Sequence, residues 1–192
     1  MNNNLLKKTE ITGIFFIMIF SLFLRYYYQW GGGALAVLVS SVNNSIWENI
    51  KVFVISYMIW GAIEILTIRP SFKRFVVAKV ITIYIAGLSG MIILCAAAIL
   101  LGKFEFWLVI ALIIVFVCFS QFASYRLISS QRDLKKIFVP SVFLLVLLIV
   151  MLCCFSVFPP QINLFKDFDT GLFGIIPEHI DIGAFYLDKF GA

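Results

Sequence analysis

Five long runs of apolar residues, separated by shorter polar connections, make up most of this sequence. The runs cover residues 11–28, 46–68, 75–101, 106–125 and 137–158. A helix needs about 20 mostly apolar residues to cross a bilayer. In hydrocarbon a lone segment satisfies its backbone N–H and C=O groups internally only when it is helical. The sequence therefore predicts an all-α membrane protein, a bundle of five transmembrane helices.

The composition also indicates that lipid rather than water surrounds most of this protein. Hydrophobic residues make up 62% of the 192 residues and charged residues only 13%, whereas soluble domains carry about 25% charged residues. The runs leave no room for a separate soluble domain. We therefore expect a transmembrane bundle over residues 1–158 and an extracytoplasmic tail over residues 159–192, in a multi-pass protein of the cell (plasma) membrane.

The net charge of +5 is unevenly distributed. Ten of the fifteen Lys and Arg precede the first run or accompany the second and fourth connections: Lys7, Lys8, Arg69, Lys73, Arg74, Lys79, Arg126, Arg132, Lys135 and Lys136. By the positive-inside rule this predicts a cytoplasmic N-terminus and an outside C-terminus. Basic loops also lie against anionic lipid headgroups, so the positive charge does not indicate a nucleic-acid partner.

The first run resembles the start of a signal peptide. The charged, aromatic segment at residues 25–30 is unlike a cleavage region and instead is typical of an aromatic belt at the membrane interface. We therefore expect the first helix to be retained.

A short apolar stretch at residues 34–39 follows three glycines and is too short to span a bilayer. It predicts a re-entrant or interfacial segment before the second helix, covered by the bundle. The tail carries six aromatic residues between its acids, so we expect it to fold back on the outer face. We expect a turn at residues 169–171 and a short amphipathic helix from Asp181.

The polar stretch at residues 41–51 begins the second span. Ser45 and Glu48 have the spacing of a capping box, in which each side chain binds the backbone N–H of the other residue. A capping role predicts that Glu48→Gln is tolerated. Lys51 lies one turn further on and is expected to extend outward toward the interface.

Helix capping leaves three asparagines of this stretch unexplained. The alternative is a polar pocket built with Gln29 and the tail. Its candidate residues are Arg25, Asn43, Asn44, Glu48 and Asn49.

Glu64 is the candidate intramembrane acid. A charged residue costs about 2.5–3.5 kcal/mol at mid-membrane on insertion scales, so Glu64 should face a partner. It shares a helix face with Tyr57 and Trp60, and a contact with Arg126 or Gln121 is expected. Otherwise Glu64 lines a water-filled cavity and binds a proton or cation.

Other reactive residues form no recognisable site. All four cysteines fall within the apolar runs and are expected to be buried thiols without disulfides or metal. The lone histidine, His179, is expected in the solvated tail. We find no catalytic triad and no phosphate-binding loop, and the sequence therefore predicts no catalytic residue, no cofactor and no metal site.

Residues 26–33 and 41–51, with pieces of the tail at 159–160 and 169–175, resemble an uncharacterised family of small bacterial polytopic membrane proteins, domain of unknown function 6512. The first family motif reads closer to V-N-E-S-V-W-E-H, so this chain has Asn44 in place of its Glu and Asn49 in place of its His. If family members use that Glu and His as ligands or acid–base groups, the departure puts such chemistry in doubt here. The resemblance implies the architecture and a link between residues 41–51 and the tail, and it names no activity.

The first hypothesis for function is the handling of a small molecule, a lipid or an ion, as a transporter component or accessory subunit. One alternative is an intramembrane enzyme acting on a lipid or prenyl substrate, with Glu48 or Glu64 as the acid–base group. Another is a structural or interaction protein of the cell envelope. The expected partners are membrane lipids, a small-molecule or ion ligand, and a second copy or another membrane protein, with no nucleic acid.

Overall fold

Helices dominate the computed structural model, which describes residues 3–31, 33–101, 106–130 and 133–176. They are α1 (Asn3–Tyr27), α2 (Gly33–Val39), α3 (Ile46–Ile68), α4 (Phe72–Leu101), α5 (Phe106–Ser129), the 3-10 helix η1 (Leu134–Ile137), α6 (Phe138–Val157) and the 3-10 helix η2 (Asn163–Phe165). The described ranges contain no strand, only one isolated bridge between Lys166 and Phe173. The predicted all-α class is confirmed.

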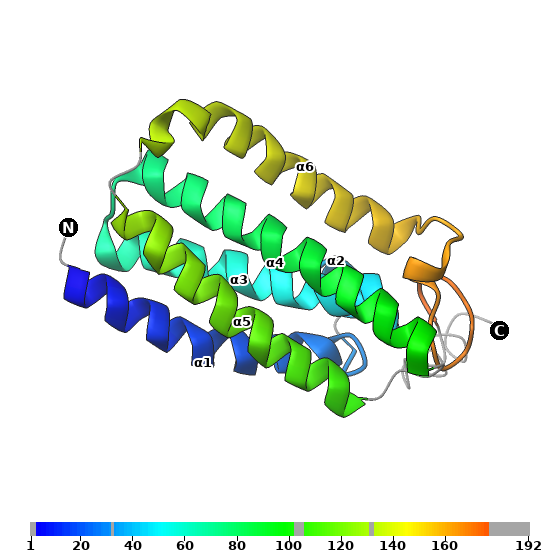
Figure 1. Ribbon diagram of the computed structural model, residues 1–192. Helices are drawn as coiled ribbons and strands as arrows, with labels where there is room; N and C mark the ends of the chain where they lie inside the picture. The colour runs from blue at the N-terminus through cyan, green and yellow to red at the C-terminus, as the bar shows by residue number, and fades with distance from the viewer. Residues whose placement is uncertain (1–2, 32, 102–105, 131–132, 177–192) are drawn as a thin grey trace.

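Within the described residues, five helical segments are long and apolar enough to cross a membrane: α1, α3, α4, α5, and α6 together with η1. They run side by side, with the N-terminus and the tail at opposite ends of the bundle (Figure 1). We call these the N-terminal end and the tail end. The second run matches α3 at both bounds, whereas α1 begins at Asn3 rather than at residue 11.

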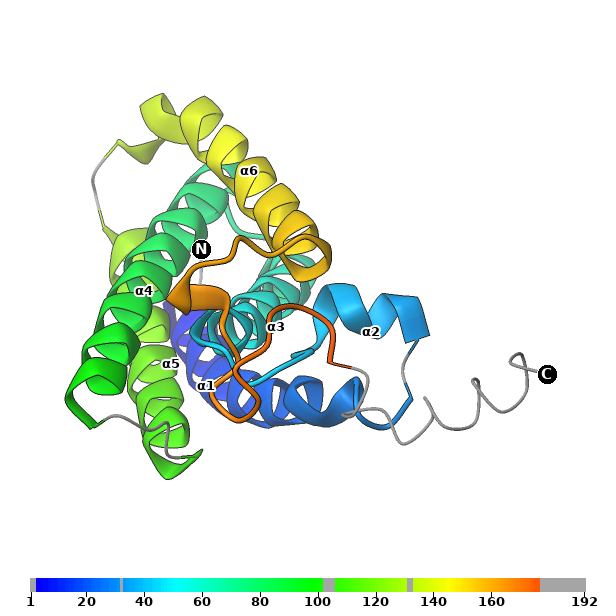
Figure 2. The ribbon, with the colours of Figure 1, turned by 90° about the vertical axis from the view of Figure 1, so that its right-hand side faces the viewer.

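Helix α3 is the most enclosed of the five. In the 18-residue apolar stretch of α3, 56% is buried inside the bundle. In the corresponding stretch of the segment that contains α6, only 11% is buried. The end-on view places α6 at the periphery, beside α4 and α2 (Figure 2). The bundle is therefore a core of four helices, α1, α3, α4 and α5, with α6 attached to one side.

Large aromatic side chains fill the core around α3. Trp47, Phe53, Tyr57 and Trp60 belong to one buried cluster that also takes in Phe116 of α5. The rings of Phe16 and Trp60 lie 5.0 Å apart and join α1 to α3. Side chains such as Ile99, which is 82% exposed, lie on the outer surface and suit contact with lipid rather than water.

The described part of the tail packs against the start of α3. The Phe165 ring lies 5.1 Å from Trp47 and 5.4 Å from Phe155 of α6. Asn43 Nδ2 donates to the Gly174 carbonyl at 2.8 Å. A turn follows Asp167, whose carbonyl accepts from Gly171 N at 3.0 Å. The expected turn is thus present, while the helix expected from Asp181 lies outside the described residues and the division after residue 158 stays a prediction.

The cysteines differ from expectation in their burial. All four are free, but Cys118 and Cys154 are exposed on α5 and α6, and Cys95 and Cys153 are half-buried. As expected from the apolar runs, all four lie on the long helices. Burial inside the bundle did not follow, because the outer surfaces of these helices are apolar as well.

Gly13 allows α1 to lie close to α3 and α5. A Cβ at this buried position would overlap Trp60 Nε1 of α3 and Gln121 Nε2 of α5. The indole ring is rigid and the Gln121 amide is held by hydrogen bonds, so neither neighbour moves away cheaply.

We expect Gly13→Ala to lower the stability of the folded protein by about 1–3 kcal/mol, as overpacking of a tight core does. Gly61→Ala on α3 is the matched control, because a Cβ there meets nothing within 4 Å. It should be neutral or slightly stabilising, since alanine favours helix over glycine. Thermal unfolding in mild detergent, followed by tryptophan fluorescence, compares the two. Equal melting temperatures would contradict the close approach at Gly13.

Candidate functional site

Three charged side chains from three helices meet inside the bundle near its N-terminal end. Glu10 comes from α1, Glu64 from α3 and Lys79 from α4, and their exposed fractions are 3%, 0% and 8%. We call these residues, with Gln121 and Ser124 of α5, the acid–lysine cluster. The cluster draws on all four helices of the core.

The Lys79 ammonium is the centre of this cluster. Its Nζ lies 3.2 Å from Glu10 Oε1 and 3.1 Å from Oε2, and it pairs with Glu64 Oε2. It also donates to Gln121 Oε1 at 3.2 Å. Ser124 Oγ donates to Glu10 Oε1 at 2.7 Å. Every one of these contacts links different helices.

The charges of the cluster do not balance. Two carboxylates face one ammonium, so the ionised groups together carry one excess negative charge. Glu64 Oε1 makes no hydrogen bond of good geometry among the described residues, although the side chains of Trp60 and Thr9 lie near this carboxylate. The Tyr57 ring, whose centre lies 5.0 Å from Lys79 Nζ, presents an electron-rich face to the ammonium and does not offset the excess negative charge. A proton or a small cation would neutralise the excess.

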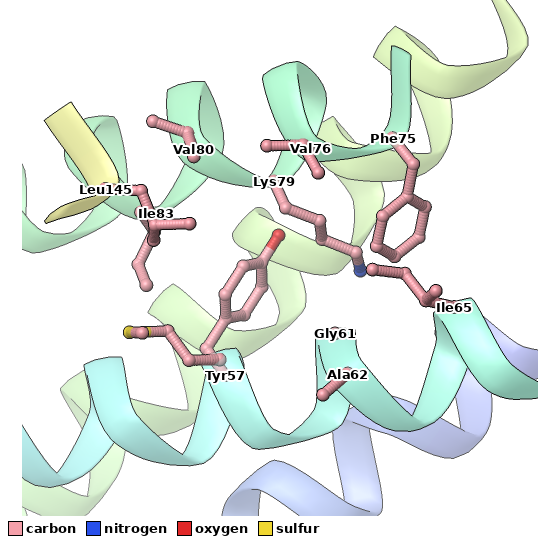
Figure 3. A pocket seen from close by; sticks show the side chains of 11 residues that line it. Tyr57, Gly61, Ala62, Ile65, Phe75, Val76, Lys79, Val80, Ile83 and Leu145 are labelled. Carbon is pink, nitrogen blue, oxygen red and sulfur yellow. The ribbon is translucent and has the colours of Figure 1, made fainter. Parts of the chain in front are cut away.

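Two cavities approach the cluster from different sides. One of about 380 Å³ lies between α1 and α5, where Glu10 and Gln121 line it together with Lys7. The other, of about 190 Å³, lies between α3, α4 and α6 (Figure 3). Its walls are apolar except where Tyr57 and Lys79 reach it. The first cavity is also lined largely by apolar side chains, but it carries both Lys7 and Glu10.

The sequence identified Glu64 but not its partner. The expected contact with Arg126 or Gln121 is wrong: Glu64 pairs with Lys79, and exposed Arg126 lies 5.3 Å from the Phe122 ring. The charge pattern groups Lys79 with the basic loop residues, and the apolar runs do not include Glu10. For Lys79 a signal existed, since it lies inside the third apolar run with apolar residues on both sides.

A second buried ion pair lies at the tail end. Lys51 Nζ is 2.6 Å from Glu48 Oε2 and donates to Ser156 Oγ of α6 at 2.8 Å and to the Val37 carbonyl of α2 at 3.1 Å. Val42 N donates to the same Glu48 oxygen at 3.0 Å. Lys51 is fully buried. The expectation that it extends outward is therefore wrong, because its charge is satisfied inside.

The capping box is only half formed. Ser45 Oγ accepts from Glu48 N at 3.3 Å, as predicted. The reciprocal bond is absent, because Ser45 N donates to Asn43 Oδ1 at 2.9 Å instead. Asn43 replaces Glu48 in this role and leaves the Glu48 carboxylate to bind Lys51.

The asparagines tie the start of α3 to α1 and to the tail. Arg25 donates to the side-chain oxygens of Asn49 and of Asn44, the latter at 2.9 Å. Asn44 N donates to Asp167 Oδ1 at 2.6 Å. These contacts join residues 41–51 to the tail.

Of the candidate pocket, Arg25, Asn43 and Asn44 line a cavity of about 100 Å³ that also includes Gln29 and Asp169. Asn49 lies beside it through its contact with Arg25, whereas Glu48 is engaged with Lys51. Ligand binding at these residues stays a prediction. His179 lies outside the described residues.

The ion pair changes the expected effect of Glu48→Gln. We now expect the variant to lose about 3–5 kcal/mol of stability, as the removal of one partner of a buried pair does. The double variant Glu48→Gln/Lys51→Met should recover part of that loss, because no buried charge is left without a partner. Thermal or denaturant unfolding of the single and double variants measures both. A tolerated Glu48→Gln would restore the simple capping role.

Comparison with known proteins supports the architecture and supplies no activity. No curated protein matches the chain, and no solved structure matches it. A family model matches residues 1–175, which include all six α-helices, both polar clusters and nearly all of the described tail. The chain therefore belongs to the family of unknown function DUF6512.

Proposed function

We propose that this protein handles a proton or a small monovalent cation inside the membrane, as a transporter component or an accessory subunit. The observation that carries the proposal is the single Lys79 ammonium shared by the carboxylates of Glu10 and Glu64. The ion would bind where the excess negative charge lies.

An ion pair with Lys79 would need only one acid. Here a second acid is kept inside the bundle, where burial of an unpaired charge is costly. Glu10 and Lys79 each lie about 10 Å from the start of their helices at 1.5 Å per residue. Ionisable groups at such depth mark ion pathways in many membrane proteins. This depth and the extra acid favour ion binding over simple packing.

The cavity between α1 and α5 supports access from the N-terminal end. Lys7 and Glu10 both line it, so polar groups extend from the first turns of α1 to the cluster. With the orientation predicted from the basic loops, this end faces the cytoplasm. The proposal therefore includes cytoplasmic access, with α2 as the interfacial or re-entrant segment on the outer side.

Ion binding predicts a stability that depends on the ion present. A ligand that binds only the folded state stabilises it by about 2.7 kcal/mol at 100 times its Kd. The melting temperature of the full-length protein in nanodiscs should therefore rise in NaCl or KCl relative to choline chloride. If the ion is a proton, the melting temperature should rise as the pH falls, because the folded state then binds more protons than the unfolded state. Glu10→Gln and Glu64→Gln should remove this dependence while folded protein is still recovered.

Asp133→Asn is the matched control, since Asp133 is an exposed acid at the same end of the bundle. It should keep the wild-type ion dependence. Liposomes loaded with a pH-sensitive dye then separate transport from binding alone. A wild-type melting temperature that is the same in all three salts and at all pH values would overturn the proposal.

A further inference from the structure

A cavity at the tail end has two chemically different sides. It occupies about 420 Å³ between the last turns of α4 and the tail segment around η2. Its apolar wall consists of Ile46, Cys95, Ala98, Ile99, Leu164 and Phe168. Its polar rim comes from Asn163, Lys166 and Asp167 of the tail. This division matches an amphipathic ligand better than a polar solute.

The accessible charge at the rim is positive. Lys166 is exposed and forms no salt bridge among the described residues. Its side chain passes close to Gly171, with Cε 3.5 Å from the point where a Cβ would stand on that glycine. Asp167 is only 1% exposed. Its carboxylate accepts from Asn44 N at 2.6 Å, from Thr170 N at 2.8 Å and from the Thr170 hydroxyl at 2.7 Å. The acid is thus fully engaged, and the lysine is left to face a ligand.

The apolar wall continues into the outer surface of α4. Ile99 lines the cavity and is 82% exposed, and Ile92 on the same helix is 69% exposed. The cavity therefore opens where apolar side chains would meet hydrocarbon. A soluble anion bound at Lys166 would leave this wall uncovered, whereas an acyl chain would cover it.

We propose that this cavity binds one anionic phospholipid, with the headgroup phosphate at Lys166 and an acyl chain along the last turns of α4. Lys166 supplies the attraction for the anion, and Asn163 offers a hydrogen bond to the headgroup. The site is separate from the acid–lysine cluster, so it stands whether or not the protein handles an ion.

Native mass spectrometry of the full-length protein tests the site. The protein is released from nanodiscs that contain equal amounts of phosphatidylglycerol and phosphatidylcholine with the same acyl chains. We expect one retained phosphatidylglycerol molecule per chain, in excess over phosphatidylcholine. Lys166→Gln should reduce that excess about fivefold, the factor that one lysine near an anionic surface contributes. Lys166→Arg keeps the positive charge at the same exposed position and is the matched control, so it should leave the excess unchanged.

A second pair of variants tests the apolar wall. Ala98→Leu fills part of the cavity and should lower the retention of both lipids, whereas Ala96→Leu, exposed on the same helix and outside the lining, should not. Melting temperatures in detergent show that each variant is folded. Should Ala98→Leu fail to fold, the exposed Lys166→Gln variant still decides. Equal retention of the two lipids by the wild type, or an excess unchanged by folded Lys166→Gln, would overturn the proposal.

Discussion

The arrangement of the helices depends on one buried ammonium, which requires anionic partners inside the bundle. Lys79 enters the core from α4, and an ammonium in hydrocarbon is tolerated only beside compensating groups. Glu10 of α1, Glu64 of α3 and Gln121 of α5 supply them. Each bond crosses between helices, so satisfying one charge also fixes the relative positions of four helices. Apolar packing alone gives weaker constraints in a membrane, because lipid chains are as apolar as the helix surfaces.

The Glu48–Lys51 pair acts in the same way at the other end. It joins α3 to α2 through the Val37 carbonyl and to α6 through Ser156. Helix α3 contributes an acid to each cluster, which explains why it is the most buried helix although its apolar content is ordinary for a span. Helix α6 joins the cluster at the tail end through Ser156, and its Leu144 carbonyl accepts from Tyr84 Oη of α4 at 2.9 Å. Its outer position in the bundle agrees with its absence from the acid–lysine cluster.

The five spans were predictable because hydropathy is a local property of the chain. The polar contacts were not, because they depend on which helix faces meet. Glu10 was missed because the apolar run begins at residue 11, while the helix continues back to Asn3 and carries the acid into the core. Lys51 was expected to reach outward, since the sequence does not show that Ser156, about a hundred residues later, completes a buried site for it. The pairing of residues 41–51 with the tail was anticipated by the polar-pocket alternative and by the family resemblance.

The surroundings of the acid–lysine cluster are asymmetric along the bundle axis. Toward the N-terminal end, the cavity between α1 and α5 carries Lys7 and Glu10. Toward the tail end, the core is closed by aromatic rings, including Trp60 against Phe16 and Phe53 against Tyr57. An ion held at the cluster would therefore exchange with one side in this conformation. Release to the other side would require α1 and α3 to separate at these rings, and the two helices pack tightly there, because a Cβ at Gly13 would overlap Trp60. The tight contact at Gly13 thus lies on the tail-end side of the proposed ion site.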